Sequence, residues 1–205
     1  MKTLLKVTSS IHGPEGQSSK LADRFAGNWS LNNPGGIVVS RDLAAQAVPH
    51  LTAERFKAFS EPDGKLSPEQ QAGVDLSNTL IAELEAADEI VIAAPMYNFD
   101  VPSTLRAYFD HVARGGVTFR YTTLGPEGLL KGKKTTVIVT RGGSYAGNAD
   151  TQTAYLKQFL GFIGLTDVEW VFAEGLAVDE HTRLSGLKAA NEAIARLQSI
   201  RVTAA

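Results

Sequence analysis

Uninterrupted apolar runs predict where the strands of this chain lie. The run 90–94 (Ile-Val-Ile-Ala-Ala) shows no alternation of apolar and polar residues and stops at Pro95. Such a run is typical of a strand with both faces covered by helices, as in a parallel sheet. Four more β-prone segments are 4–8, 37–39, 135–139 and 168–172. We therefore expect five strands, of which 90–94 forms the third.

Apolar residues at helical spacing predict helices between these strands. Leu21, Phe25 and Trp29 recur at i, i+4 and i+8, which gives one apolar stripe on a helix over about 18–30. Ser67 followed by Pro68 is a strong helix start, with serine as N-cap and proline in the first helical position. That helix is expected to run to about residue 87. Further helices are expected after 102 and over about 151–163 and 180–200, with a short one within 52–59.

Strands that alternate with helices indicate an α/β fold, a doubly wound five-stranded parallel sheet with helices on both faces. The strand order 2-1-3-4-5 is expected, and the 205 residues fit a single domain, 1–205. Two long connections, 44–67 and 115–132, interrupt the alternation. Segments of this length often cap a site or build an interface. The second contains Phe119, Arg120 and Tyr121 and is expected to be irregular.

Composition narrows the classes of function. The net charge is −2, with 20 basic and 22 acidic residues and no basic cluster, so we expect no nucleic-acid partner. No apolar segment is long enough to predict a membrane span, and the first ten residues lack the apolar stretch of a signal peptide. The absence of cysteine excludes disulfides, thiol catalysis and thiolate metal sites, and we predict no metal site. We expect a cytoplasmic protein.

Strands one, three and four each end in a loop of unusual composition, and the expected strand order makes these strands neighbours. The three loops should therefore meet at one crevice, where doubly wound sheets bind ligands. The first loop (9–19) carries Ser9, Ser10, Gln17, Ser18 and Ser19 at the start of a helix. Free amides and the helix dipole at that position favour a phosphate. A plain serine N-cap is the alternative interpretation.

Two familiar phosphate motifs are absent from the first loop. The dinucleotide motif G-x-G-x-x-G is not met by Gly13 and Gly16 alone, and no lysine followed by serine or threonine completes a P-loop. A phosphate-receiver domain would need aspartate where Pro95 stands. The loop suits a terminal phosphate monoester, and FMN is the common cofactor with that group.

The second loop (96–99) and the third loop (140–143) fit the ring system of a flavin. Large side chains in the second loop can lie along a flat ring, while the Asn98 carboxamide can bond ring heteroatoms. In the alternative interpretation, Met96 and Phe99 pack into the core. The glycines of the third loop allow close approach of main chain to a ring edge, unless they form only a tight turn. The residues concerned are Met96, Tyr97, Asn98, Phe99, Thr140, Arg141, Gly142 and Gly143.

A set of motifs extends over nearly the whole chain, at 9–10, 17–18, 94–99, 116–121, 125–128, 141–143, 159–164 and 172–175. These motifs resemble those of the FMN-dependent NADH:quinone oxidoreductases, also called FMN-dependent NADH-azoreductases. This resemblance implies a flavodoxin-like FMN-binding domain over 1–205 and a homodimer with non-covalent FMN, one per subunit, at the subunit boundary. It implies phosphate binding by Ser10, Gly16, Gln17 and Ser18 and ring binding by the second and third loops. Gly16 and Thr140 stand where relatives often carry serine.

The implied activity is a ping-pong transfer of two electrons from NADH to a quinone, and in two cycles to an azo compound, which yields amines. FMN carries the chemistry, so no catalytic side chain is expected. Tyr121 and Phe162 are predicted to form an aromatic substrate wall for the partner subunit's flavin, with ordinary core packing as the alternative. A non-catalytic flavodoxin-type electron carrier or a regulatory flavin-binding module is the alternative function. The choice between NADH and NADPH is left open.

Overall fold

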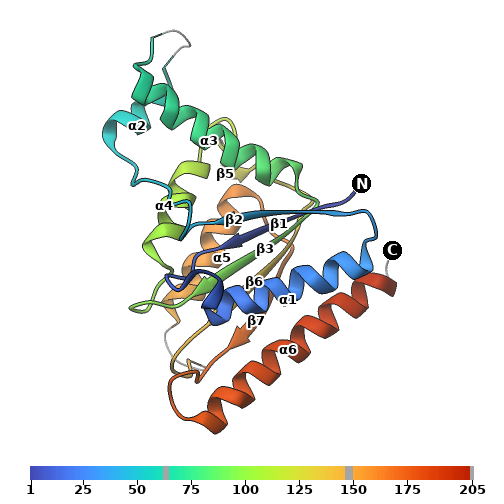
Figure 1. Ribbon diagram of the computed structural model, residues 1–205. Coiled ribbons are helices and arrows are strands. Elements are labelled where there is room, and N and C mark those ends of the chain that lie inside the picture. Colours follow the sequence, from blue (N-terminus) through green and yellow to red (C-terminus); the bar gives the residue numbers. More distant parts are fainter. Residues whose placement is uncertain (62–64, 146–149, 204–205) are drawn as a thin grey trace.

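The computed structural model describes residues 1–61, 65–145 and 150–203 (Figure 1). Helices and strands alternate along most of the chain. The elements are β1 (Thr3–Thr8), η1 (Gly13–Glu15), α1 (Gln17–Asn32), β2 (Ile37–Asp42), α2 (Ala53–Ala58), α3 (Pro68–Ala86), β3 (Glu89–Pro95), α4 (Ser103–Val112), β4 (Phe119–Thr122), β5 (Gly125–Gly128), β6 (Lys134–Thr140), α5 (Thr151–Ile163), β7 (Val168–Ala173) and α6 (Glu180–Thr203).

Five strands form one parallel sheet in the order β2-β1-β3-β6-β7. This is the predicted order 2-1-3-4-5, because β6 and β7 are the fourth and fifth strands of the sheet. The register pairs Thr8 with Ala93 and Pro95 with Thr140. Strands β1, β3 and β6 therefore end at the same edge, and their exit loops meet there.

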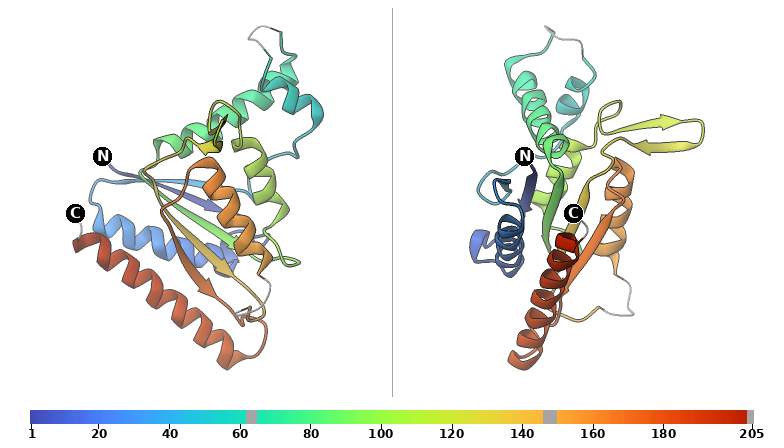
Figure 2. Two further views of the ribbon diagram at one scale, coloured as in Figure 1. Left: turned by 180° about the vertical axis from the view of Figure 1, so that it is seen from behind. Right: turned by 90° about the vertical axis from the view of Figure 1, so that its right-hand side faces the viewer.

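Helices cover both faces of the sheet, as predicted (Figures 1 and 2). Helices α1 and α6 lie side by side on one face, where Phe25 and Trp29 are fully buried. Helices α3, α4 and α5 supply the second core, in which Leu105 and Phe109 are buried against β3 and β6. The two cores fix the sheet between them, so the edge with the three loops rests on rigid elements.

The start of α3 follows the predicted chemistry, whereas the start of α1 does not. Ser67 caps α3 in a capping box, because its Oγ accepts from the Gln70 amide at 3.2 Å and the Gln70 Oε1 accepts from the Ser67 amide at 2.9 Å. Helix α1 begins one residue earlier than expected, at Gln17, and its N-cap is Gly16. Glycine offers no side chain to the first turn of α1, which bears on the site below.

The connection 115–132 is not irregular, contrary to expectation. It contains an antiparallel hairpin of β4 and β5, which projects from the body of the protein (Figure 2). The sequence does not predict this hairpin, because the β5 segment is Gly-Pro-Glu-Gly and these residues seldom form strands. The turn lacks the usual Asn-Gly signal and depends on the Thr122 hydroxyl, which donates to the Gly125 carbonyl at 2.8 Å, and on the positive φ of Gly125.

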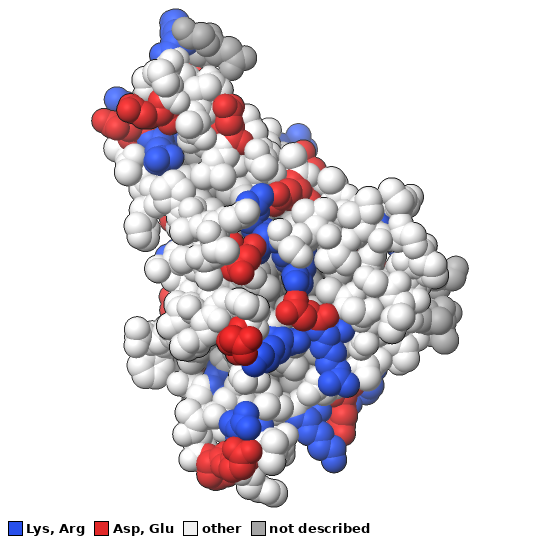
Figure 3. All heavy atoms as spheres, viewed as in Figure 1, with Lys and Arg blue, Asp and Glu red and all other residues white. Residues whose placement is uncertain are grey.

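The surface shows charges of both signs close together. On the face in Figure 3, lysine and arginine side chains lie next to aspartate and glutamate. Examples of such pairs are Lys6 with Asp23 and Lys20 with Glu15. Within the described ranges, no helix is both long enough and apolar enough to span a membrane.

Candidate functional site

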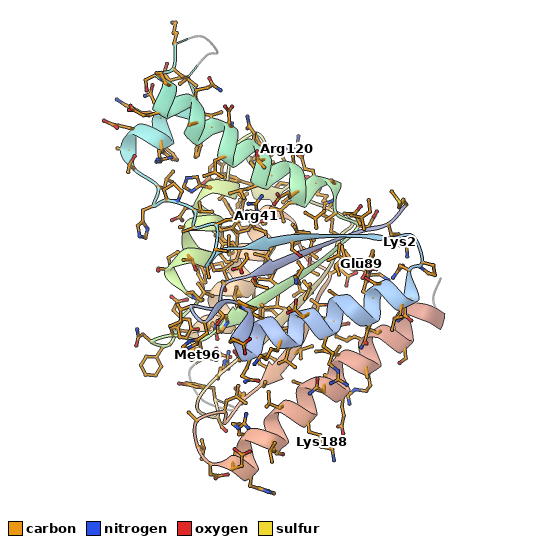
Figure 4. All side chains as sticks on the ribbon, viewed as in Figure 1. Lys2, Arg41, Glu89, Met96, Arg120 and Lys188 are labelled. Carbon is orange, nitrogen blue, oxygen red and sulfur yellow. The ribbon has the colours of Figure 1, made fainter. Side chains whose placement is uncertain are left out.

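A pocket of about 170 Å³ opens where β1, β3 and β6 end. Nine of the twelve residues predicted to bind a cofactor line it; Asn98, Phe99 and Gly143 do not. His12, Pro95 and Leu176 also line the pocket, although they were not predicted as site residues. Figure 4 labels Met96 at this end of the sheet, close to the start of α1. The nine are Ser10, Gly16, Gln17, Ser18, Met96, Tyr97, Thr140, Arg141 and Gly142.

Ser9 and Ser10 are adjacent in the first loop, but their hydroxyls have different hydrogen-bond partners. The buried Ser9 hydroxyl donates to the carbonyl of Ala93 on β3, at 2.8 Å, and so fixes the loop to the sheet. The Ser10 hydroxyl lies 3.3 Å from the Tyr97 hydroxyl and accepts from the His12 amide at 3.2 Å. Ser10 therefore lines the pocket and links the first loop to the second.

The start of α1 leaves hydrogen-bonding groups without partners. Gly16 gives no side-chain cap, so the first amides of the helix have no acceptor from that residue. The Ser18 and Ser19 hydroxyls are buried and have no hydrogen-bond partner in the part of the chain that the structure describes. A buried hydroxyl without a partner is unfavourable. Since Ser18 lines the pocket, an anionic ligand there would satisfy its hydroxyl and the helix amides together.

The need for a glycine at position 16 comes from limited space for a side chain, not from backbone conformation. Its φ is −63°, which any residue can adopt, but a Cβ at this position would lie 2.1 Å from the Ser10 Oγ and 2.5 Å from the Ser10 Cβ. The glycine therefore makes room for the Ser10 side chain at the pocket.

The second loop is a tight turn with two strained residues. Tyr97 and Asp100 exchange amide-to-carbonyl hydrogen bonds of 2.9 and 3.1 Å. Asn98 and Phe99 between them have φ values of 50° and 69°, which makes a type I′ turn without glycine. Such strain is concentrated at functional sites. Phe99 is 67% exposed, so the interpretation that places it in the core is wrong.

In the third loop, the Arg141 side chain turns into the protein. Its guanidinium is 1% exposed and pairs with Asp150 at 2.7 Å and Glu174 at 3.0 Å. Burial raises the pKa of Asp150, but hydrogen bonds from Thr153 and Arg141 outweigh it, so the pKa stays below its ordinary value. The guanidinium is thus committed to these partners, and the Arg141 amide and carbonyl bond Ala173 and Leu176. A role for Arg141 in cofactor binding stays a prediction.

Tyr121 and Phe162 do not line the 170 Å³ pocket. Tyr121 is 78% exposed on the hairpin and lines a separate cavity of about 430 Å³ with Phe59 and Arg114. Phe162 is half-buried, packs against Phe119 with ring centroids 4.2 Å apart, and lines a pocket of about 290 Å³ on α5. Tyr121 is therefore not a core residue. Within one subunit the structure does not bring either residue to the pocket.

Comparison with known proteins identifies the family. Residues 1–197 match the family model described as "Flavodoxin-like fold". An FMN-dependent NADH:quinone oxidoreductase of Burkholderia lata is 52% identical over 196 residues, which cover 95% of this chain and 99% of that protein. The chain belongs to the FMN-dependent NADH:quinone oxidoreductase family. Another member of this family, from Alteromonas mediterranea, is 47% identical over 199 residues, with 96% and 98% of the two chains covered.

Solved structures agree with membership of the FMN-dependent NADH:quinone oxidoreductase family, which the sequence motifs predicted. An azoreductase from Bacillus anthracis str. Sterne superimposes with a TM-score of 0.87 at 27% identity, covering 97% of this chain and 99% of that one. An FMN-dependent NADH-azoreductase from Bacillus anthracis str. Ames Ancestor, solved in complex with FMN, gives a TM-score of 0.85 at 26% identity, covering 97% and 100%.

Proposed function

We propose that this protein is an FMN-dependent NADH:quinone oxidoreductase that also cleaves aromatic azo compounds to amines. The observation that carries the proposal is the buried Ser18 hydroxyl, which has no hydrogen-bond partner among the described residues. It lies at the start of α1, which has no side-chain cap, beside the exit loops of β3 and β6. This arrangement fits a phosphate monoester next to a planar ring. Membership of a family whose relatives are named for FMN, NADH and quinone supports the assignment.

The residues at the pocket divide into two groups by what they would bind. Ser10, Gln17 and Ser18, with the first amides of α1, would hold the phosphate of FMN; Gly16 gives them space. The second and third loops would hold the isoalloxazine ring, with main-chain groups of 140–143 along one edge. Asn98 stands in the positive-φ turn of the second loop, and binding of ring heteroatoms by its carboxamide stays a prediction.

Bound FMN would supply two-electron chemistry, with NADH as donor and a quinone as acceptor. The protein's own task is then to bind, orient and shield the reactants, and no side chain is required as a catalytic acid or base. The nearly neutral charge of −2 does not match the strongly acidic surface usual for flavodoxin-type carriers, so the non-catalytic alternative is not favoured.

We further propose that the protein acts as a homodimer. The hairpin projects from the body, and Figure 4 labels its Arg120 far from Met96, so Tyr121 is poorly placed to reach its own pocket. In a dimer, Tyr121 and the aromatic face of α5 with Phe162 would be available as a wall for the partner's flavin. A cytoplasmic location and a single domain over 1–205 stay predictions.

The decisive experiment combines cofactor analysis with steady-state kinetics. Protein purified from cells is denatured, and the released cofactor is identified by mass spectrometry; FMN is expected. NADH oxidation is then followed with and without a benzoquinone and with an aromatic azo dye. Turnover that requires the acceptor supports the proposal. Release of FAD, or tight FMN binding with no turnover by any acceptor, would overturn it in favour of another flavoprotein or of a carrier.

Ser18→Ala directly tests whether the Ser18 hydroxyl binds the phosphate. If the hydroxyl serves a charged phosphate, its removal should weaken FMN affinity by about 1 to 3 kcal/mol. Affinity is measured by titrating apoprotein with FMN and following the quenching of flavin fluorescence. Ser30→Ala, on the exposed far end of α1, is the matched control and should leave the dissociation constant unchanged. An unchanged constant for Ser18→Ala would leave Ser18 with a structural role only.

A further inference from the structure

One side-chain amide lies between the ends of the two strands that carry the second and third loops. Gln152, in the first turn of α5, is fully buried. Its Nε2 donates to the carbonyls of Ala94 and Pro95, each at 3.2 Å, at the end of β3. Its Oε1 accepts from the Nε of Arg141, also at 3.2 Å, just past the end of β6. Gln152 therefore joins the two exits through a single side chain.

The chemistry of these contacts requires an amide. The two carbonyl oxygens need two N–H donors, whereas the Arg141 guanidinium needs an acceptor. Only asparagine or glutamine offers two donors and an acceptor on one planar group. A carboxylate would suit Arg141 but would face the carbonyls of Ala94 and Pro95 with a second acceptor. The orientation of the Gln152 amide is thus fixed by its partners.

Arg141 is itself held rigidly, so Gln152 is bonded to a fixed group. The remaining guanidinium nitrogens bond Asp150, Glu174 and the Thr153 hydroxyl. Asp150 also caps α5 by accepting from the Thr153 amide at 2.9 Å. The start of α5 and the third loop are consequently one hydrogen-bonded unit.

The same helical turn also holds the far end of the second loop. The Thr151 hydroxyl donates to the Phe99 carbonyl at 2.7 Å. Gln152 thus fixes the residues before Met96, and Thr151 fixes the strained residue at the other end. A turn with two non-glycine residues at positive φ needs such bonds, because isolated chains rarely adopt it.

We propose that Thr151 and Gln152 are positioning residues for the flavin ring, which set the second loop relative to the third before the cofactor binds. The proposal rests on the proposed function, since it assigns the ring to these two loops. Neither residue lines the pocket, so each acts through the loops rather than by touching the cofactor. The expected consequence is that loss of either contact lowers FMN affinity and alters the environment of the bound flavin.

Thr151→Val is the sharpest test, because it keeps the side-chain shape and removes only the hydroxyl. The dissociation constant for FMN should rise about three- to ten-fold, the usual effect of one lost hydrogen bond. The visible absorption and circular dichroism of bound flavin should shift, while the melting temperature of the apoprotein stays close to that of wild type. Thr151→Ser restores the hydroxyl and should recover wild-type affinity and spectrum. An unchanged constant and spectrum in Thr151→Val would overturn the role of Thr151.

Gln152→Met tests the central contact with a side chain of similar length. It removes the donor to two carbonyls and the acceptor of the Arg141 Nε, so affinity should fall ten-fold or more and the melting temperature should drop. Ser77→Ala is the matched control, because Ser77 is fully buried and donates to the His111 carbonyl at 2.6 Å, away from both loops. The control should lose stability but keep its affinity for FMN. Equal affinities in Gln152→Met and wild type would overturn the proposal; Thr151→Val decides it if Gln152→Met does not fold.

Failure of the proposed function can be distinguished from failure of the positioning role. Wild-type apoprotein that does not bind FMN would overturn both proposals at once. In apoprotein, hydrogen exchange at the Tyr97 and Asp100 amides reports on the turn alone, since these amides bond across it. Faster exchange in Thr151→Val than in Thr151→Ser supports a role of the Thr151–Phe99 hydrogen bond in holding the turn. FMN binding by wild type with equal exchange and equal affinity in both variants would overturn the positioning role only.

Discussion

At the scale of single residues, the contact between Gly16 and Ser10 controls the shape of the phosphate end of the pocket. We predict that Gly16→Ala weakens FMN binding, because the new Cβ would lie 2.1 Å from the Ser10 Oγ and would displace that side chain. The loss should be about 1 to 3 kcal/mol if Ser10 bonds the phosphate. Fluorescence titration of apoprotein with FMN measures it.

Gly27→Ala is the matched control for this prediction. Gly27 lies on the same helix, α1, and nothing lies within 4 Å of the Cβ it would gain. Replacing a glycine inside a helix by alanine should raise the free energy of unfolding by about 0.5 to 1 kcal/mol and leave FMN affinity unchanged. Equal FMN affinities in the two variants would show that Ser10 moves aside without loss and would contradict the prediction.

A buried histidine makes stability depend on pH. His111 is fully buried in α4; its Nδ1 bonds the Ala107 carbonyl at 3.0 Å, and its Nε2 has no partner among the described residues. Burial lowers the pKa of His111 below its ordinary value of 6.5; nearby Arg55 lowers it further, while the Ala107 bond and Asp110 act in the opposite direction. The folded protein therefore keeps this ring neutral at a pH where the unfolded chain binds a proton.

The sign of the effect follows from proton linkage. The contribution of His111 is fully present above about pH 6.5 and is lost as the pH falls below it, by up to about 1.4 kcal/mol per pH unit. Urea unfolding of apoprotein at pH 7.5 and pH 5.5 should show a larger loss for wild type than for His111→Leu. His50→Leu, which removes an exposed histidine, should behave as wild type. Equal losses in wild type and His111→Leu would contradict the prediction.

At the scale of elements, close backbone contact fixes the base of the hairpin against α5. A Cβ on Gly128 would lie 2.0 Å from the Gly164 amide nitrogen, and the Leu130 amide bonds the Ile163 carbonyl at 2.9 Å. We predict that Gly128→Ala forces the hairpin away from α5 and lowers the free energy of unfolding by about 1 to 3 kcal/mol or more. Thermal unfolding of the purified variant measures it.

Gly161→Ala is the corresponding control on α5, because nothing lies within 4 Å of the added Cβ. It should be neutral or stabilising. If Gly128→Ala melts at the same temperature as Gly161→Ala, the hairpin base tolerates movement and the contact has no structural importance.

Elements set by local chemistry were predictable from the sequence, whereas those set by distant contacts were not. The apolar run before Pro95 and the cap at Ser67 each specify a strand or a helix within a few residues. Strand β5 has no such signal, since Glu127 is held in place by ion pairs with Arg120 and Lys131. The hairpin was therefore visible only as a long connection.

The same distinction applies to the candidate site. Serines and glycines directly after strands could be read from the sequence, because strand ends in a parallel sheet locate a ligand crevice. Gln152 could not, since it lies 58 residues from Ala94 and resembles any polar residue at the start of a helix. The pairing of the Arg141 side chain with Glu174 also depends on a residue 33 positions away in the chain.

At the scale of the whole molecule, the exposed hairpin residue Tyr121 does not line the pocket of its own subunit. If the proposed dimer exists, Tyr121 of one subunit completes the flavin site of the other. Sedimentation analysis should then give about twice the chain mass of 21.9 kDa. Tyr121→Ala is a suitable variant for kinetics because this side chain is 78% exposed and its loss leaves the core intact.

Mixed dimers test the exchange of Tyr121 between subunits. One subunit carries a pocket disabled by Ser10→Ala with Ser18→Ala but keeps Tyr121; the other binds FMN but carries Tyr121→Ala. After unfolding and refolding together, a heterodimer would contain one complete site, formed by the FMN of the second subunit and the Tyr121 of the first. NADH:quinone turnover per bound FMN should therefore exceed that of the Tyr121→Ala homodimer. Refolding the subunits separately before mixing is the control, and activity equal to the average of the two homodimers would place Tyr121 outside the partner's site.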